Sequence, residues 1–218
     1  MAKAADRERP IDDRLLDTAI DQFGRKGLEG ASTRAIAAAA RTTMSSITYH
    51  YGGKEGLYLE AARHIAGQIS QRFSIAMADA RPPDHLDPQA ATEEVLSLLE
   101  AFLQIMLRAE AAPWARFIVR EQMEPTEAFE ILWEEVMSKV AARLVALVLR
   151  AGHGRWDKAG ARVRAATLIG QVLVFRVARA TVLRITGWSA IDAGRAAEIR
   201  GVLHANVRAM LTSNGSPS

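Results

Sequence analysis

Apolar residues recur at three- and four-residue steps along most of the chain, which is the periodicity of amphipathic helices. The first such stretch is predicted to end at Lys26–Gly27, because glycine readily adopts the left-handed backbone found at helix ends. Two short helices should follow, one over 33–40 capped by Ser32 and one capped by Thr43 or Ser45 that ends near Tyr51. The apolar positions of the first stretch are Leu15, Leu16, Ala19, Ile20 and Phe23.

A longer helix begins at Lys54, and later helices are predicted near 92–109, 113–122, 125–151, 157–186 and 192–212. Alanine is abundant and runs of β-branched residues are short, so nothing favours strands. The predicted fold is all-α, with an N-terminal three-helix helix-turn-helix unit over 1–60 and a helical bundle over 61–212. The polar tail 213–218 is predicted to be disordered.

Composition narrows the class of protein. The 218 residues include no cysteine, which excludes disulfides, thiolate metal sites and a cysteine nucleophile. No apolar run approaches the roughly 18 residues that a membrane span needs, and the charged N-terminus lacks the apolar stretch of a signal peptide. We therefore expect a cytoplasmic protein with no membrane partner.

Basic residues gather in one segment of a chain whose overall net charge is only +3. Between positions 22 and 54 the sole acid is Glu29, so the net charge of this segment is +4. The five cations are Arg25, Lys26, Arg34, Arg41 and Lys54. A local excess of this kind is compatible with nucleic-acid binding but does not establish it.

Two eight-residue helices joined by a tight turn have the dimensions of a DNA-binding helix-turn-helix. Ile36, Ala37 and Ala40 would pack inward from the first helix and Ile47 from the second. The outward positions of the second helix are polar, small or aromatic and carry no full charge, which suits base edges and phosphates. Periodicity alone fits an ordinary helical hairpin with a solvated face equally well.

The residues themselves favour the first interpretation. The runs Thr33-Arg34-Ala35-Ile36-Ala37, Ile47-Thr48-Tyr49-His50-Tyr51 and Gly53-Lys54-Glu55-Gly56-Leu57 closely resemble the DNA-binding signature of the TetR/AcrR family of repressors. The family's turn usually reads Ala-Gly-Val, whereas this chain has Ala40-Arg41-Thr42. Arg41 is therefore expected at a position where glycine is usual. Further along, Arg120-Glu121-Gln122 with Pro125-Thr126, and the stretch from Gly170 to Trp188, are similar to the CecR-like branch of the family.

The resemblance implies roles in DNA binding. The helix over about 43–51 would enter the major groove. Arg34 would contact a guanine edge or, alternatively, contact a phosphate or simply be solvated. Tyr49 would contact a phosphate or pack within the hairpin. The complete set of implied DNA-binding residues is Thr33, Arg34, Met44, Ser45, Ser46, Thr48, Tyr49, His50 and Lys54.

The family also implies a homodimer and a small-molecule effector. Helix 157–186 is apolar on more than one face, so together with 192–212 it is the candidate dimer surface, or else a buried core helix. An apolar or amphiphilic effector would contact aromatic and methionine side chains, although such a stripe is more often plain core. The arginines in the set would bind an anionic group or form internal ion pairs with Glu121, Glu124 or Glu135. The candidate effector residues are Phe102, Met106, Trp114, Phe117, Arg120, Met123, Trp133, Phe175 and Arg176.

Enzymatic and carrier functions fit the sequence less well. The five histidines form no metal-ligand pair, and the acids from Glu121 to Glu134 lack the histidines that a di-iron bundle requires. No glycine-rich phosphate loop is present, and no cofactor is expected. The polar outer face of the second short helix argues against a helical ligand carrier. A ligand-responsive repressor that binds a palindromic operator is the predicted function.

Overall fold

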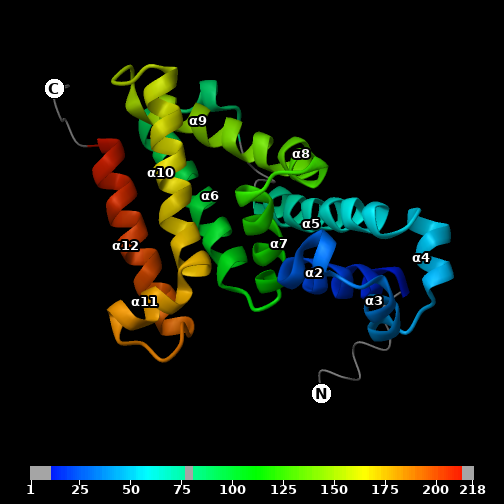
Figure 1. The fold of residues 1–218 in the computed structure, drawn as a ribbon. Helices are drawn as coiled ribbons and strands as arrows, with labels where there is room; N and C mark the ends of the chain where they lie inside the picture. Colours follow the sequence, from blue (N-terminus) through cyan, green and yellow to red (C-terminus); the bar gives the residue numbers. More distant parts are fainter. Residues whose placement is uncertain (1–10, 77–80, 213–218) are drawn as a thin grey trace. The chain divides into compact units, whose positions relative to one another are not determined.

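The chain folds into helices throughout the part that the structure describes, residues 11–76 and 81–212 of a computed structural model (Figure 1). The all-α prediction is confirmed. The predicted tail 213–218 lies outside the described residues. The helices form two compact units, one made of 11–69 and 110–136 and the other of 70–109 and 137–212.

The first unit begins with α2 (Ile11–Gly30), α3 (Thr33–Ala40), α4 (Met44–Tyr51) and the N-terminal part of α5 (Lys54–Ala76). The bounds of α3 and α4 agree with the prediction because their caps are local. The Ser32 hydroxyl accepts the Ala35 N–H at 3.4 Å, and the Thr43 hydroxyl accepts the Ser46 N–H at 3.1 Å. Of the two caps predicted for the second short helix, Thr43 is the one used.

Two glycines shape the chain on either side of these short helices. Gly27 interrupts α2 with φ 73° and ψ 177°, so the predicted break is confirmed, although helical turns resume as far as Gly30. Gly56, in the first turn of α5, would carry a Cβ only 1.7 Å from the carbonyl oxygen of Tyr51. No larger residue fits there, and the end of α4 can therefore pass directly beneath the start of α5.

Three more elements complete the first unit: α7 (Ala111–Met123), α8 (Glu127–Leu132) and the π-helical turn η2 (Trp133–Met137). Gly24 permits a close approach of α7 to α2, since a Cβ there would lie 3.2 Å from both the Phe117 nitrogen and the Pro113 carbonyl oxygen. Arg116 of α7 also forms a 2.7 Å ion pair with Asp21 of α2. The compact unit is consequently larger than the predicted segment 1–60 and draws on a second stretch of sequence.

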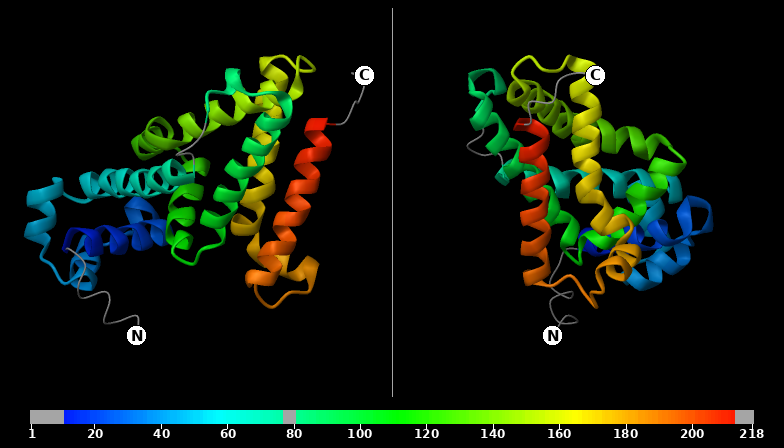
Figure 2. Two further views of the ribbon diagram at one scale, coloured as in Figure 1. Left: turned by 180° about the vertical axis from the view of Figure 1, so that it is seen from behind. Right: turned by 90° about the vertical axis from the view of Figure 1, so that its left-hand side faces the viewer.

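The second unit contains the short turn η1 (Pro83–His85), α6 (Pro88–Leu107), α9 (Ser138–Gly152), α10 (Lys158–Val177), α11 (Arg179–Thr186) and α12 (Ala193–Thr212). Helix α6 packs against α9, α10 and α12, and α10 runs beside α12 in both views of Figure 2. The fully or almost fully buried side chains of this unit include Val95, Leu99, Leu144, Val148, Leu168, Val172 and Val207.

One of the two long predicted helices is broken. The segment predicted over 125–151 is helical without interruption from Glu127 to Gly152 and contains the π-helical turn η2 between α8 and α9. The helix predicted over 157–186 instead leaves helical geometry at Ala178, with α10 and α11 bent by 85°. This break does not fall on a glycine or proline. Near it the Arg176 guanidinium donates to the carbonyl oxygens of Met106 and Arg108, a nonlocal contact that local patterns do not reveal.

Within the described part of the chain, no helix is by itself long and apolar enough to cross a membrane. Only α10 and α11 taken together reach the length and composition of a span, and the two are sharply bent relative to each other.

Candidate nucleic-acid interface

Helix α4 presents one broad exposed face. Ile47 is fully buried, whereas Met44 is 46% and Tyr49 85% exposed. Ser45, Thr48 and His50 are exposed as well, and Ser46 is half-buried. The structure thus brings the residues predicted to face the groove onto one surface.

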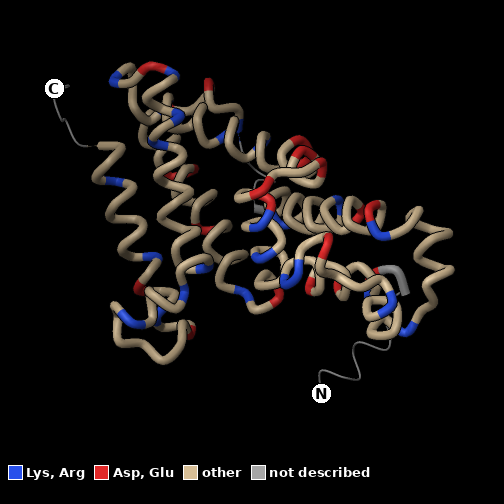
Figure 3. The backbone as a smooth tube through the Cα atoms, in the orientation of Figure 1, with Lys and Arg blue, Asp and Glu red and all other residues tan. Residues whose placement is uncertain are grey.

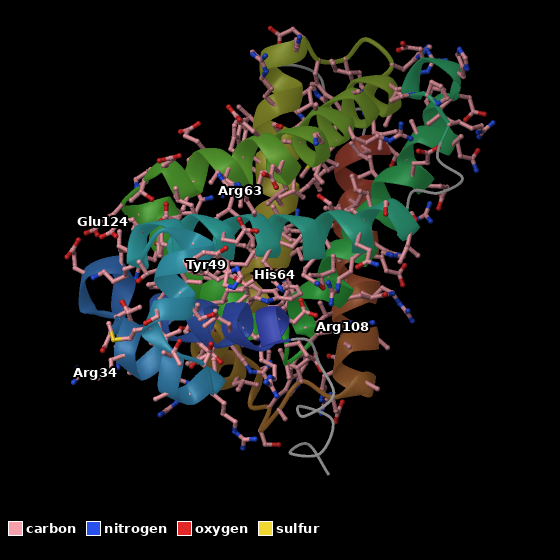
Figure 4. All side chains as sticks on the ribbon, turned by 90° about the vertical axis from the view of Figure 1, so that its right-hand side faces the viewer. Arg34, Tyr49, Arg63, His64, Arg108 and Glu124 are labelled. Carbon is pink, nitrogen blue, oxygen red and sulfur yellow. The ribbon has the colours of Figure 1, made fainter. Side chains whose placement is uncertain are left out.

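The exposure of Tyr49 bears on the alternative that it packs within the hairpin. Its ring meets the His50 ring edge-on, with 5.0 Å between centroids, and otherwise projects outward in the view onto α4 (Figure 4). The Tyr49 side chain is therefore not part of the hairpin core.

The lysine and arginine side chains nearest to α4 in sequence belong to the neighbouring helices and to the turn before α4, not to α4 itself. The helix itself carries no lysine, arginine or acid (Figure 3). Arg34 is exposed on α3 and projects away from the helices (Figure 4), while Thr33 at the start of α3 is half-buried. A neutral face flanked by cations allows close approach to bases while neighbouring groups meet phosphates.

Lys54, which is predicted to contact a DNA phosphate, also forms a contact within the protein. Its ammonium group donates to the Glu29 carbonyl oxygen at 3.3 Å and so joins the start of α5 to the end of α2. An ammonium has three protons, which leaves donors for a phosphate.

The turn between α3 and α4 is left-handed at Arg41, the position at which glycine is usual in the family that the sequence resembles. Arg41 has φ 57° and ψ 44°. Its N–H donates to the Ala38 carbonyl at 3.2 Å, and the Thr42 N–H donates to the Ala37 carbonyl at 2.9 Å. This conformation costs a residue with a Cβ roughly 1–2 kcal/mol relative to right-handed backbone.

A buried cluster of three aromatic rings, one pair edge-on and the other tilted, joins the helices of this unit. The Tyr58 ring of α5 lies between Phe23 of α2, at 4.9 Å between centroids, and Phe117 of α7, at 4.7 Å. All three side chains are almost completely buried. Such contacts fix the relative rotation of the helices as well as burying area.

The Tyr58 hydroxyl donates a 2.5 Å hydrogen bond to the Glu121 carboxylate, which is 1% exposed. The other carboxylate oxygen accepts the N–H of Thr126 at 3.0 Å and its hydroxyl at 2.9 Å. Burial raises the pKa of Tyr58 above its ordinary value, the hydrogen bond and charge of Glu121 raise it further, and the charge of Arg120 opposes the rise. Sequence reasoning missed this network, since it considered Glu121 only as a partner for an arginine.

The predicted effector residues fall in both units. Trp114 and Phe117 are buried in the first unit, whereas Met123 and Trp133 of that unit are 78% and 44% exposed. In the second unit Met106 is buried, and Phe102, Phe175 and Arg176 are half-buried. Arg176 bonds to main-chain carbonyls, so neither an acidic side chain nor an effector is needed to satisfy it.

Arg120 differs from Arg176 in its surroundings. It is half-buried, and its Nε is shielded from solvent without a hydrogen-bond partner among the residues described. Its guanidinium lies over Gly27, where a Cβ would come within 3.0 Å of Nη1. Of the two arginines singled out from the sequence, Arg120 is the one with unused donors in a sheltered place.

Comparison with known proteins identifies relatives along most of the chain. Residues 15–61 match the family described as bacterial regulatory proteins, tetR family, and residues 91–213 match the C-terminal domain of the HTH-type transcriptional dual regulator CecR. The Shigella flexneri protein of that name is 34% identical, covering 82% of this chain and 81% of its own. A Pseudomonas putida transcriptional repressor, NicS, is 31% identical over 45% of this chain and 42% of its own.

Solved structures share the fold. A transcriptional regulator from Rhodococcus superposes with a TM-score of 0.62 at 16% identity, covering 94% of this chain and 98% of its own. A TetR-family member from Streptomyces coelicolor gives 0.60 at 19% identity, with 93% and 91% coverage. These likenesses show that the chain has the fold of these regulators.

Removing the Tyr58 hydroxyl tests the buried network. We expect Tyr58→Phe to lower the free energy of unfolding by about 1–3 kcal/mol at neutral pH, because a buried carboxylate loses one donor.

Above pH 10 the unfolded tyrosine ionises while the folded one stays protonated, so wild-type stability should fall by up to about 1.4 kcal/mol per pH unit through this group. Tyr58→Phe should lack that component in urea titrations at pH 9–11. An alkaline decline identical to that of wild type would contradict the network, and Tyr49→Phe, at an exposed hydroxyl, is the control.

Proposed function

Because the chain belongs to the TetR family of transcriptional regulators, we propose that it is a repressor that binds a palindromic operator as a homodimer and is released by a small-molecule effector. The observation that carries this proposal is the neutral, exposed polar and aromatic face of α4 between flanking cations. One relative, the Pseudomonas putida protein NicS, is named a repressor, which supports repression as the direction of regulation.

Each of the predicted DNA-binding residues has a role in the proposed complex. Helix α4 lies in the major groove, where Ser45, Ser46, Thr48 and His50 reach base edges or phosphates and Met44 meets a thymine methyl group. Arg34 reads guanine through its two-pronged guanidinium. Thr33, Tyr49 and Lys54 hold phosphates, and the helix starts at Thr33 and Lys54 add main-chain N–H groups that favour an anion.

The proposed dimer uses the exposed faces of α10 and α12. The inward face of α10 carries buried Leu168 and Val172, but Val163, Val174 and Val177 are 65%, 41% and 54% exposed. Val202 of α12 is 58% exposed. These two helices run side by side, joined by a 3.2 Å hydrogen bond from Asn206 to Gln171.

Two glycines on these helices support close packing against a second copy. Apart from the adjoining residues and the local backbone of the helix, a Cβ built on Gly170 or Gly201 would meet no atom of the described residues within 4 Å. A mid-helix glycine costs about 0.5–1 kcal/mol relative to alanine, and no neighbour in the chain requires it at either position. A partner helix that approaches closely would require it.

The proposed effector is amphiphilic and anionic, with Arg120 as its charged contact. The shielded, unpartnered Nε of Arg120 supports this assignment. The adjoining Gly27 lies in the last part of α2, which leads directly into α3, so an anion that moves the guanidinium acts on the helix that carries Arg34. The effector must bind the DNA-incompetent conformation more tightly, since equal affinity for both would shift nothing.

Selection from a random duplex library yields the operator on which the DNA contacts can be tested. Arg34→Ala should weaken binding by about 1–3 kcal/mol and relax preference at one base pair of each half-site. Lys54→Ala should weaken all sequences alike and reduce the slope of log K against log salt by about one unit for each protomer bound.

These two roles are exchanged if Lys54→Ala alters base preference and Arg34→Ala does not. Lys139→Ala, which removes an exposed lysine from α9 and thus avoids the proposed dimer helices, serves as the control for net charge. If the wild-type protein enriches no sequence from the library, the proposed function itself is wrong.

The dimer surface can be tested with a leucine at a vacant position. Gly201→Leu should leave the fold intact, because Gly201 is exposed and a Cβ added there meets open space. It should weaken dimerisation at least about tenfold by blocking helix approach. Gly67→Leu on the exposed face of α5 is the matched control, since a Cβ there also has no neighbour within 4 Å. Sedimentation equilibrium at micromolar concentration measures both variants. A Gly201→Leu dimer as strong as that of Gly67→Leu would remove this surface from the proposal.

Effector release can be tested by reciprocity. A panel of aliphatic and aromatic carboxylates, titrated calorimetrically, should include one that binds wild type and binds Arg120→Gln much more weakly. Operator DNA must lower the affinity for that carboxylate by the same factor by which the carboxylate lowers operator affinity. Equal carboxylate affinities with and without operator would show a ligand that has no regulatory effect.

A further inference from the structure

Two described residues other than glycine adopt positive φ: Arg41 at 57° and His153 at 48°. Each ends a helix, α3 and α9 respectively, in the left-handed conformation. Glycine would occupy either position without steric cost. Residues in sparsely populated backbone regions cluster at functional sites, so an outlier of this kind invites a functional explanation.

The Arg41 side chain has no structural role that explains its presence. It is exposed, and its guanidinium forms no hydrogen bond or ion pair with the described residues. The backbone bonds that close the helix end, from the N–H groups of Arg41 and Thr42, need no side chain at all. The arginine therefore contributes a free charge at a turn that glycine would form more readily.

The position of that charge points to a ligand. Arg41 precedes Thr43, the cap of α4, by two residues, and α3 on its other side carries Arg34. A recognition helix contacts bases with its N-terminal residues. The turn just before such a helix consequently lies at the edge of the groove, where the duplex presents its phosphates. A guanidinium matches phosphate oxygens with two parallel donors.

We propose that Arg41 binds a phosphate of the DNA backbone and so adds to the affinity for any duplex, without reading sequence. This inference rests on the proposed DNA binding by α4. Arg41 then has two functions: its left-handed backbone joins α3 to α4, and its side chain attracts the duplex.

Four variants separate charge from backbone strain. Arg41→Gly removes both, Arg41→Gln removes the charge but keeps a Cβ, and Arg41→Lys keeps both charge and Cβ. His153→Gly relieves the same kind of backbone conformation in the other unit and is the matched control. The probe is a random-sequence duplex of about 30 base pairs, because non-specific binding depends on phosphate contacts.

Fluorescence anisotropy between about 50 and 200 mM salt gives the readout. For each protomer bound, Arg41→Gly and Arg41→Gln should lose about one unit of salt slope, so the advantage of wild type should shrink about 3.5-fold across that fourfold range. Arg41→Lys keeps the charge and should keep the wild-type salt slope, although it lacks the paired donors of a guanidinium. His153→Gly should follow wild type in both affinity and slope. Thermal unfolding should show Arg41→Gly at least as stable as wild type, which excludes misfolding as the cause.

Three results would overturn the inference. Wild-type affinity and slope in both Arg41→Gly and Arg41→Gln would remove Arg41 from the interface. An equal loss in His153→Gly would assign the effect to the fold. On a selected operator, a change of base preference in Arg41→Gln would make Arg41 a sequence reader rather than a phosphate anchor. In each case wild-type binding to DNA would stand, so the proposed function is tested separately.

Discussion

The hydrogen bond between Tyr58 and the buried carboxylate of Glu121 is the contact on which the first unit depends most. A carboxylate out of reach of water is tolerated only when donors surround it, and here the donors come from α5 and from the turn between α7 and α8. The same Tyr58 ring fills the space between Phe23 and Phe117. One side chain thereby fixes both the spacing and the rotation of three helices.

The exposed face of α4 follows from that fixed support. Ile47 is the only fully buried residue of α4, so the helix is held largely by its ends: the Thr43 cap, and the junction with α5 that Gly56 permits. A helix anchored in this way can leave nearly its whole outer surface free. In the proposed complex the uncharged surface of α4 approaches the bases closely, while the cations on the neighbouring helices attract the phosphates.

Local features of this unit could be predicted from sequence, and nonlocal ones could not. Ser32, Thr43 and Gly27 act on their immediate neighbours, so the short helices and the break were predictable. The Glu121 network was not, because its partners Tyr58 and Thr126 lie on separate elements. The bend at Ala178 has no local signal either. The predicted effector residues share a residue type, but residue type does not determine burial: Phe117 is enclosed, whereas Met123 is exposed.

The contribution of α7 to the first unit has a consequence for biosynthesis. A ribosome releases Phe23 and Tyr58 well before it has made residues 111–123, so the nascent helices expose their apolar faces until α7 arrives. A helix-turn-helix segment cut out at residue 60 would expose the apolar faces that α7 covers in the complete unit. A chimaera that exchanges this segment between relatives inherits a surface shaped for its original α7, and the two stretches need to be exchanged together.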